Sequence, residues 1–314
     1  MTSTPAPMAS LTIGTRGSPL ALAQTRLVTE LLAAAWPGIT CSIRVIETRG
    51  DRTQAAGEPL PEIGGKGLFT AELERALQDG EIDAATHSLK DLPTTESEGI
   101  VLGAVCARED ARDCVITHEG HALGGLGERS TVGTSSPRRA AQLRALRPDL
   151  RVQSVRGNVG TRVRKAREGE VDAVVVAAAG IRRLGLEDEV AEWLPETTML
   201  PAPGQGALAV QCRAGDAAAL AALRAVDNPG TRAATTAERG FLADLGAGCS
   251  APVGAYARSQ PDGSLHMAAL VASLDGTRVV RVDGTGTDAT ELGARLARHA
   301  RAGGASAILD EVRG

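Results

Sequence analysis

Aromatic residues are scarce in this 314-residue chain, which contains two Phe, two Trp and one Tyr. Proteins that bind single-stranded nucleic acid stack bases on aromatic side chains, so this scarcity argues against that class. The chain is also acidic overall, with a net charge of −4, whereas nucleic-acid-binding domains are usually basic. We therefore expect no nucleic-acid partner.

Long apolar runs are absent as well. The run Ala173–Ala179, which no other run exceeds, is far shorter than the roughly 20 residues that a membrane-spanning helix needs. The segment Met1–Ser10 has no lysine, no arginine and no apolar run, so it does not resemble a secretory signal. These observations predict a cytoplasmic protein without a membrane partner.

Paired cysteines are missing too. The five cysteines are odd in number and none forms a CxxC pair, which argues against a disulfide framework and a zinc ribbon. They are Cys41, Cys106, Cys114, Cys212 and Cys249. His118 and His121 lie near Cys114 in sequence, but no fourth ligand is close to them. We expect reduced thiols and no metal.

Lysine is rare, and arginine takes its place. Of 34 basic residues only three are lysines, and residues 129–183 hold thirteen basic and four acidic residues, a local net charge of +9. Arginines that converge on one concave surface would attract and hold an anionic ligand such as a polycarboxylate or a polyphosphate. The alternative is that they are solvated residues on helix surfaces.

Apolar strand-like runs alternate with helical patterns over most of the chain, which predicts an α/β fold with mostly parallel sheets. The expected strands are 11–15, 42–48, 82–88, 100–106, 113–117, 131–133, 152–155, 171–178 and 207–212, and the expected helices are 19–35, 68–79, 137–146 and 159–168. After about residue 231 the order changes. A helix to about 245, strands at 253–257, 265–273 and 278–284 and a helix from about 290 predict a small α+β domain.

One short pattern occurs twice. Residues 13–19 and 132–137 both read as a strand, a Gly-Thr turn, a Ser that can cap a helix and a Pro at the first helical position. Each turn would present backbone N–H groups at a helix N-terminus, where anions bind, and two such turns facing each other across a cleft could grip one large anion. Alternatively, strand–turn–helix joints look alike for folding reasons alone.

The segment His87–Pro93 follows an expected strand directly. It places Lys90 beside Asp91 at the carboxyl edge of that strand, and Pro93 prevents a helix from continuing there. Ligands of open α/β sheets bind at this edge, so we expect Asp91 to face a substrate.

A loop of small residues, Gly246–Pro252, surrounds Cys249. Small neighbours let a bulky group approach the sulfur, and nearby arginines would favour its thiolate. A lone cysteine is, however, more often a buried apolar residue.

Seven segments, in this order along the chain, resemble signature segments of the porphobilinogen deaminase (hydroxymethylbilane synthase) family. They are Gly64–Phe69, His87–Pro93, Gly133–Arg139, Arg156–Arg162, Ala179–Gly185, Pro203–Ala207 and Gly248–Cys249. The resemblance runs from about Leu11 into the tail. It implies the fold class: α/β, with two domains like type II periplasmic binding proteins flanking a cleft, and a small C-terminal α+β domain.

The family arrangement and the α/β pattern together predict three domains. Domain 1 comprises residues 10–106 with a returning segment 206–226, domain 2 comprises 107–205, and domain 3 comprises 227–314. Because the chain crosses twice between domains 1 and 2, we expect a hinge there.

The resemblance also implies an activity. The family is a transferase of tetrapyrrole (porphyrin, heme) biosynthesis that joins four porphobilinogen units head to tail on a covalently bound dipyrromethane cofactor. Ammonia is released at each step, and linear hydroxymethylbilane is then hydrolysed off. Each pyrrole bears one acetate and one propionate. The expected substrate is porphobilinogen, and the expected state is a monomer.

The resemblance implies a role for each residue of this chain that matches a signature segment. Asp91 would be catalytic, and Cys249 would bind the dipyrromethane through a thioether. The remaining residues would bind carboxylates: Lys90, Ser136, Arg138, Arg139, Arg162 and Arg183 on the cofactor, and Arg16, Ser18 and Arg156 on the substrate.

Two other classes of protein share some of these sequence features. A cytoplasmic organic-anion-binding protein of the type II periplasmic-binding class, without catalysis, would explain the paired turns but not the extra tail domain. A cysteine hydrolase lacks a local nucleophile signature and an evident base.

Overall fold

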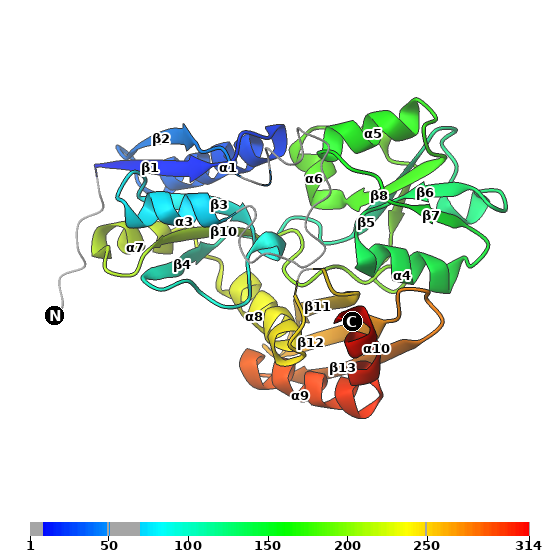
Figure 1. The fold of residues 1–314 in the computed structure, drawn as a ribbon. Helices are drawn as coiled ribbons and strands as arrows, with labels where there is room; N and C mark the ends of the chain where they lie inside the picture. The colour runs from blue at the N-terminus through cyan, green and yellow to red at the C-terminus, as the bar shows by residue number, and fades with distance from the viewer. Residues whose placement is uncertain (1–8, 49, 51–69, 249, 314) are drawn as a thin grey trace. The chain divides into compact units, whose positions relative to one another are not determined.

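The computed structural model describes residues 9–48, 50, 70–248 and 250–313. The chain divides into two compact units, residues 1–109 with 207–232 and residues 110–206 with 233–314. Among the described residues each unit contains a five-stranded sheet, and the second unit also contains a three-stranded sheet (Figure 1). The α/β class with a small C-terminal sheet domain is thereby confirmed. The limits of the three expected domains stay predictions.

The sheet of the first unit is mixed. In spatial order its described strands are β2 (Thr40–Val45), β1 (Ser10–Thr15), β3 (Ala84–Ser88), β10 (Leu208–Arg213) and β4 (Ile100–Val105). β1 runs parallel to β2 and β3, whereas β10 runs antiparallel to β3 and β4. Helices α1 (Pro19–Ala35) and α7 (Ala217–Arg224) share one apolar core with this sheet, and α3 (Ala71–Gln78) belongs to a second core.

The large sheet of the second unit repeats this plan. In spatial order its described strands are β7 (Arg151–Gln153), β6 (Thr131–Gly133), β8 (Ala173–Ala177), β5 (Asp113–Thr117) and β9 (Glu192–Leu194). β6 is parallel to β7 and β8, and β5 is antiparallel to β8 and β9. Helices α5 (Val159–Arg167) and α6 (Ala178–Arg183) pack in one core of this sheet, and α4 (Pro137–Leu146) packs in the other.

The two copies of the repeated sequence pattern occupy equivalent places in these sheets. Each builds the central parallel strand and the following helix, β1 with α1 and β6 with α4. Ser18 caps α1 by accepting the amide of Ala21, and Ser136 caps α4 by accepting the amide of Arg139. A proline begins each helix, as Pro is favoured at the first helical position. The predicted strand–turn–cap arrangement is confirmed in both.

The C-terminal sheet is antiparallel, with β12 (Leu265–Ala272) between β11 (Val253–Ser259) and β13 (Val279–Gly286). Alternate residues of β12 point to opposite faces. Met267 and Val271 belong to the core formed with α8 (Pro229–Asp244), α9 (Ala289–Ala302) and α10 (Ala305–Arg313). Leu270 instead packs with Ala141 of α4. Both faces of β12 are therefore buried, one of them against the preceding α/β layer.

The structure differs from the expected elements in a few places. The expected strand 171–178 is shorter, because β8 ends at Ala177 and α6 begins at the next residue. Helix α7, helix α10 and the short edge strand β9 were not expected. Among the described residues, no helix combines the length and apolarity that crossing a bilayer requires.

Candidate functional site

In the first unit the turn after β1 and the turn after β3 lie at the same edge of the sheet. The strands are parallel neighbours, with Ile13 opposite Ala84, so their carboxyl ends coincide. A hydrogen bond from Nε2 of Gln24 to Oγ of Ser88, 2.9 Å long, joins helix α1 to the end of β3. This edge brings together four residues predicted from sequence: Arg16, Ser18, Lys90 and Asp91.

Lys90 and Asp91 lie in a single 3-10 turn, Leu89–Asp91, directly after β3. The turn is anchored by Leu89, which is fully buried and donates its backbone amide to the carbonyl of Ala207 at 3.0 Å. The amide of Leu92 closes the turn on the carbonyl of Leu89. Asp91 is exposed at this edge, whereas Leu89 and Leu92 on either side of it are buried. The arrangement presents a carboxylate on a short, fixed turn.

His87 belongs to β3, two residues before this turn, and is buried. Burial, together with the nearby charge of Arg16, lowers its pKa to about 4, although a hydrogen bond with the Gln211 side chain acts in the opposite direction. The imidazole is therefore neutral near pH 7. The charge of Arg16 acts on this ring, which places that guanidinium near the end of β3.

In the second unit the parallel strands β6, β7 and β8 also end at one edge. Oγ of Ser135 donates to the carbonyl of Val155 at 2.7 Å and so ties the turn after β6 to the loop after β7. Nε of Arg162 donates to the carbonyl of Gly157 at 3.0 Å, which holds the start of α5. The loops and helices that follow these strands carry the remaining described residues of the prediction: Ser136, Arg138, Arg139, Arg156, Arg162 and Arg183.

Two of these arginines are buried around a carboxylate that the sequence did not reveal. Arg138 and Arg139 are 3% and 5% exposed, and Asp113 is fully buried. Nη1 of Arg138 and Nη2 of Arg139 each donate to one oxygen of Asp113 at 2.8 Å. For this pair the alternative of a solvated helix surface is wrong. The available signal was a single charged residue at the start of an otherwise uncharged strand, residues 113–117.

Arg183 is held from a third segment. Its Nη2 donates to the carbonyl of Gly206 at 2.6 Å, and the adjacent Gln205 contacts Asp113. Sequence reasoning named the segment Pro203–Ala207 without giving it a role. The structure places it against Arg183 and the buried pair.

The expected cofactor cysteine, Cys249, lies outside the described residues, as does the signature segment Gly64–Phe69. The cysteines that the structure does describe are free. Burial raises the pKa of Cys114 to about 12 and that of Cys212 to about 11. Both are therefore protonated thiols near neutral pH and poor nucleophiles.

The comparisons with known proteins identify the family. The family model described as "Porphobilinogen deaminase, dipyromethane cofactor binding domain" matches residues 11–221, and "Porphobilinogen deaminase, C-terminal domain" matches residues 233–302. The chain belongs to the porphobilinogen deaminase family.

Relatives named porphobilinogen deaminase match nearly the whole chain. The protein of Desulforudis audaxviator is 50% identical over 303 residues, covering 96% of this chain and 97% of the relative. That of Roseiflexus castenholzii is 48% identical over 302 residues, covering 96% and 98%. Among solved structures, the methionine-binding protein MetQ has a TM-score of 0.42 at 10% identity, covering 71% of this chain and 92% of that one. The effector-binding domain of BenM has a TM-score of 0.40 at 16% identity, covering 69% and 90%.

The described residues fit the cofactor that names this porphobilinogen deaminase domain. A dipyrromethane with acetate and propionate side chains is a polycarboxylate, and guanidinium groups bind carboxylates through paired N–H donors. In the described part of the chain, Arg138 and Arg139 share the single carboxylate of Asp113, and Nε of each is buried without a hydrogen-bond partner. Such a pair retains donors and net positive charge for a further carboxylate.

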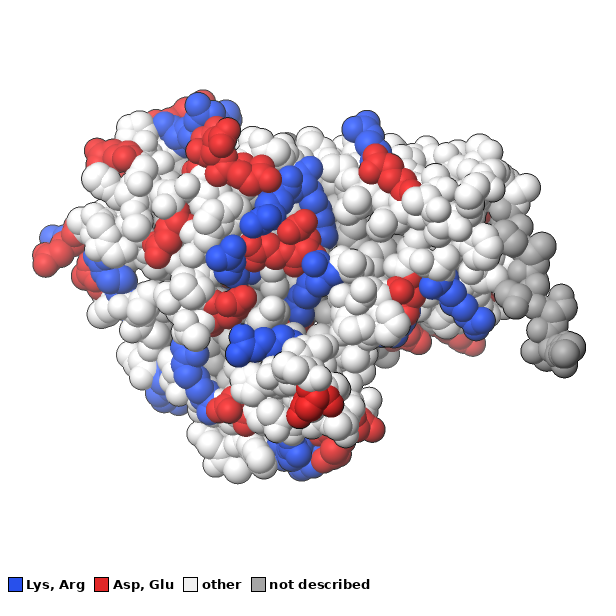
Figure 2. Space-filling model, turned by 180° about the vertical axis from the view of Figure 1, so that it is seen from behind, with Lys and Arg blue, Asp and Glu red and all other residues white. Residues whose placement is uncertain are grey.

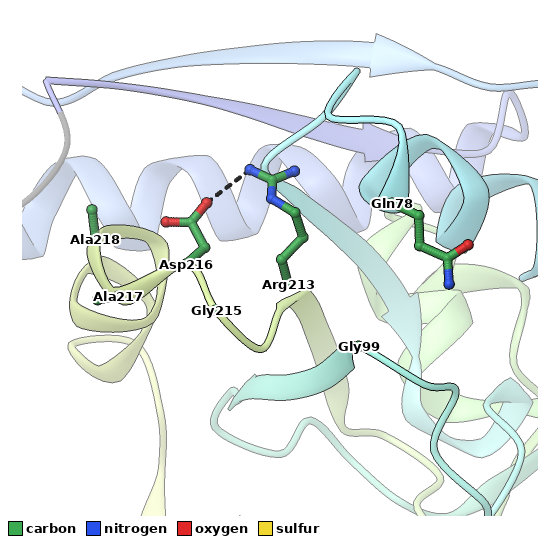
Figure 3. Close-up of a pocket in the computed structure, with 7 residues that line it drawn as sticks. All are labelled: Gln78, Gly99, Arg213, Gly215, Asp216, Ala217 and Ala218. Atoms are coloured by element: carbon green, nitrogen blue, oxygen red, sulfur yellow. Dashed lines mark hydrogen bonds and ion pairs between the residues drawn. The ribbon is translucent and has the colours of Figure 1, made fainter.

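A depression of about 700 Å³ in the first unit lies elsewhere. Its lining includes Gly99, Arg213 and Asp216, beside the start of β4 and the end of antiparallel β10, and therefore at the opposite edge from Asp91 (Figure 3). The guanidinium of Arg213 is already bound to the carboxylates of Asp216 and Asp83 and to two backbone carbonyls. We assign this depression no part in the porphobilinogen deaminase site.

Many basic residues of the Arg-rich window pair with acidic residues. Lys165 pairs with Glu170 at 3.1 Å, Arg167 with Glu189 at 3.0 Å, and Arg164 with Glu168. On the face drawn in Figure 2, Lys and Arg side chains are likewise interspersed with Asp and Glu. The field of the window is therefore weaker than its count of arginines suggests.

Proposed function

We propose that this chain is a porphobilinogen deaminase, a transferase that joins four porphobilinogen units on a covalently attached dipyrromethane and releases hydroxymethylbilane. One observation carries the proposal. In a chain of this family, Lys90 and Asp91 follow β3 at the same sheet edge where Arg16 and Ser18 follow β1. A carboxylate with cationic neighbours at a strand end suits an anionic substrate whose ring becomes positively charged.

Two groups of residues would hold the carboxylates. Cys249 would attach the dipyrromethane covalently. The carboxylates of the dipyrromethane would be bound by Lys90, Ser136, Arg138, Arg139, Arg162 and Arg183. Those of the incoming porphobilinogen would be bound by Arg16, Ser18 and Arg156. When bound, the dipyrromethane supplies a pyrrole with a free α-carbon to which the first porphobilinogen is joined. The arginines orient carboxylates, because a planar guanidinium matches the two oxygens of a carboxylate.

Asp91 would act on the charge that the reaction develops. Loss of ammonia from porphobilinogen leaves positive charge on the pyrrole nitrogen, and a carboxylate within hydrogen-bond reach of that N–H stabilises it. The same carboxylate could accept a proton when the ring returns to neutrality. The short turn anchored by buried Leu89 supports this role, because a fixed charge needs little reorganisation during the reaction.

The decisive experiment is an intact-mass measurement under denaturing conditions. Wild type should exceed the mass of the bare polypeptide and give a positive colour test for linked pyrroles, whereas Cys249→Ala should show the bare mass and no activity. Cys41→Ala, which changes a free cysteine among the described residues, is the matched control and should resemble wild type. A wild type that has the bare mass and consumes no porphobilinogen would instead fit the anion-binding alternative.

We expect Asp91→Asn to lower turnover by about 10²- to 10³-fold, as removal of one preorganised electrostatic partner does elsewhere. Asp79→Asn changes an exposed aspartate of the same unit and should leave turnover near wild type. Both are measured as hydroxymethylbilane formed by the cofactor-loaded proteins. Equal turnover in the two variants would remove Asp91 from the chemistry.

A cytoplasmic location, a monomeric state and the absence of a nucleic-acid partner complete the proposal. Size-exclusion chromatography with light scattering tests the monomer, and a dimer mass would contradict it.

A further inference from the structure

Asp113 is a buried carboxylate at the edge of the large sheet of the second unit, and the proposed function gives it no role. It begins β5 and pairs with Ala177, the last residue of β8, so it lies at the carboxyl edge of the parallel strands. Among the described residues its two oxygens accept hydrogen bonds from three side chains. These are Arg138 and Arg139 at 2.8 Å each and Gln205 at 2.7 Å. A carboxylate held by three donors has a fixed orientation.

The arginines converge on this carboxylate. Successive helical residues point about 100° apart, yet the guanidiniums of both neighbours on α4 bond to the two oxygens of Asp113. Burial alone would raise the pKa of Asp113, but the charges and hydrogen bonds of Arg138 and Arg139 hold it well below its usual range. Asp113 is therefore a permanent anion between two cations, and the cluster keeps one positive charge in excess.

The supports around the cluster are buried as well. Nη1 of Arg138 also donates to the carbonyl of Leu200 at 2.6 Å, and Nε2 of Gln205 donates to the carbonyl of Ala111 at 2.7 Å. Gly204, the neighbour of Gln205, donates its amide to buried Glu238 of α8 at 2.7 Å. The cluster is thus joined to the helix that precedes the loop of Cys249.

Resting on the proposed function, we infer that Asp113 is a positioning residue that fixes the guanidiniums of Arg138 and Arg139 for carboxylates of the dipyrromethane. It does not touch that group itself, because its oxygens are occupied by the two arginines and Gln205. If Asp113 lost its charge, the two guanidiniums would repel each other. If its carboxylate were displaced, the guanidiniums would take up different positions. Either change should slow acquisition of the cofactor.

The test follows cofactor loading rather than turnover. The full chain is produced in cells that cannot make porphobilinogen, incubated with porphobilinogen and sampled by intact mass. Asp113→Asn removes the charge, and Asp113→Glu keeps the charge but displaces it by one methylene. Both should load about 10- to 100-fold more slowly than wild type, the range found when carboxylates that orient metal ligands are removed.

Asp149→Asn is the matched control. Asp149 pairs with Arg147 at the opposite end of the same helix, at 2.6 Å. It should load at the wild-type rate, and urea unfolding of every variant separates folding from loading. If Asp113→Asn fails to fold, loading is measured on two other variants, Asp113→Glu and Gln205→Leu. The latter removes one hydrogen-bond donor to Asp113.

The outcomes are distinct. Slow loading of Asp113→Glu with a near-native unfolding midpoint supports positioning. Wild-type loading of the folded Asp113 variants, or loading that simply follows the unfolding midpoint across all variants, overturns it in favour of a structural ion pair. Failure of wild type itself to load would refute the proposed function instead.

Discussion

Gly14 and Gly133 explain why one sequence pattern occurs twice. They lie at equivalent positions of the central parallel strands, opposite Ala85 and Val174. Neither has a positive φ, so the reason for glycine is space. A Cβ on Gly133 would lie 2.5 Å from Cγ2 of Val155, and one on Gly14 would lie 2.3 Å from Cδ1 of Ile82. Close packing at the strand end thus favours glycine in both sheets, more strictly at Gly133, because at Gly14 the end of the flexible Ile82 side chain could move.

We expect Gly133→Ala to destabilise the second unit by about 1–3 kcal/mol, the usual cost of overpacking a core. Val155 is β-branched and cannot rotate away easily. Gly240→Ala is the control, because a Cβ there meets nothing within 4 Å and removal of a glycine from helix α8 should stabilise by about 0.5–1 kcal/mol. Urea unfolding of both variants measures the difference. A Gly133→Ala midpoint at or above wild type would contradict the packing argument.

His87 makes the stability of the first unit depend on pH. The folded chain binds a proton there with a pKa of about 4, against an ordinary value of 6.5. Between these values the unfolded chain holds more protons, so stability falls as the pH drops from 6.5 to 4, by about 3 kcal/mol in total. Above pH 6.5 the group is neutral in both states and contributes no further change.

His87→Asn should remove this dependence, and His299→Asn, which changes an exposed histidine of α9, should retain it. The measurement is the free energy of unfolding at a series of pH values from 4 to 7. Three parallel curves would show that His87 is not the titrating group.

Predictability at this scale depends on how local the interaction is. The caps Ser18 and Ser136 follow from residues within three positions of each other, and they could be predicted. The bonds of Asp113 to Arg138 and Arg139 span 25 and 26 residues, and they require β5 to lie beside β8. No local pattern encodes that pairing.

Among the elements, helix α9 offers a test of local stability. Asp288 caps it by accepting the amide of Glu291 at 2.9 Å, with the acid at the third helical position that is typical of a capping box. Asp288→Ala should cost about 1 kcal/mol in the free energy of unfolding, whereas Asp288→Ser keeps an acceptor and should cost much less. Equal unfolding midpoints for the two variants would show that the cap is dispensable.

Strands and helices whose ends are marked in the sequence were predicted. Elements without a marked end or a clear apolar periodicity were missed. The expected helices 19–35 and 137–146 coincide with α1 and α4, since a Ser-Pro start marks each. The apolar run Ala173–Ala179 continues across the boundary of β8 and α6, so periodicity cannot divide it. Helix α7 is mostly alanine and leucine, and β9 has three residues at a sheet edge.

At the scale of the whole molecule, connectivity decides how the units form. The chain leaves the first unit after residue 109 and returns at 207 to supply β10, which lies between β3 and β4. The second large sheet also places its antiparallel strand, β5, between two others, but β5 follows the crossing directly. Among the described strands of the first sheet, β4 pairs only with β10. That sheet therefore cannot be completed until β10, a segment about 100 residues after β4 in the sequence, has joined it.

A fragment of residues 1–109 should accordingly fail to fold, because β3 and β4 would both expose unpaired backbone groups where β10 belongs. The same fragment joined through a flexible Gly/Ser linker to residues 207–232 should regain a cooperative unfolding transition, since it restores β10 and the apolar residues of α7 that pack against Leu32 and Val28. Far-UV circular dichroism during urea unfolding compares the two. A cooperative transition in residues 1–109 alone would mean that β3 and β4 pair without the returning strand, and the first unit would then be independent of the second crossing.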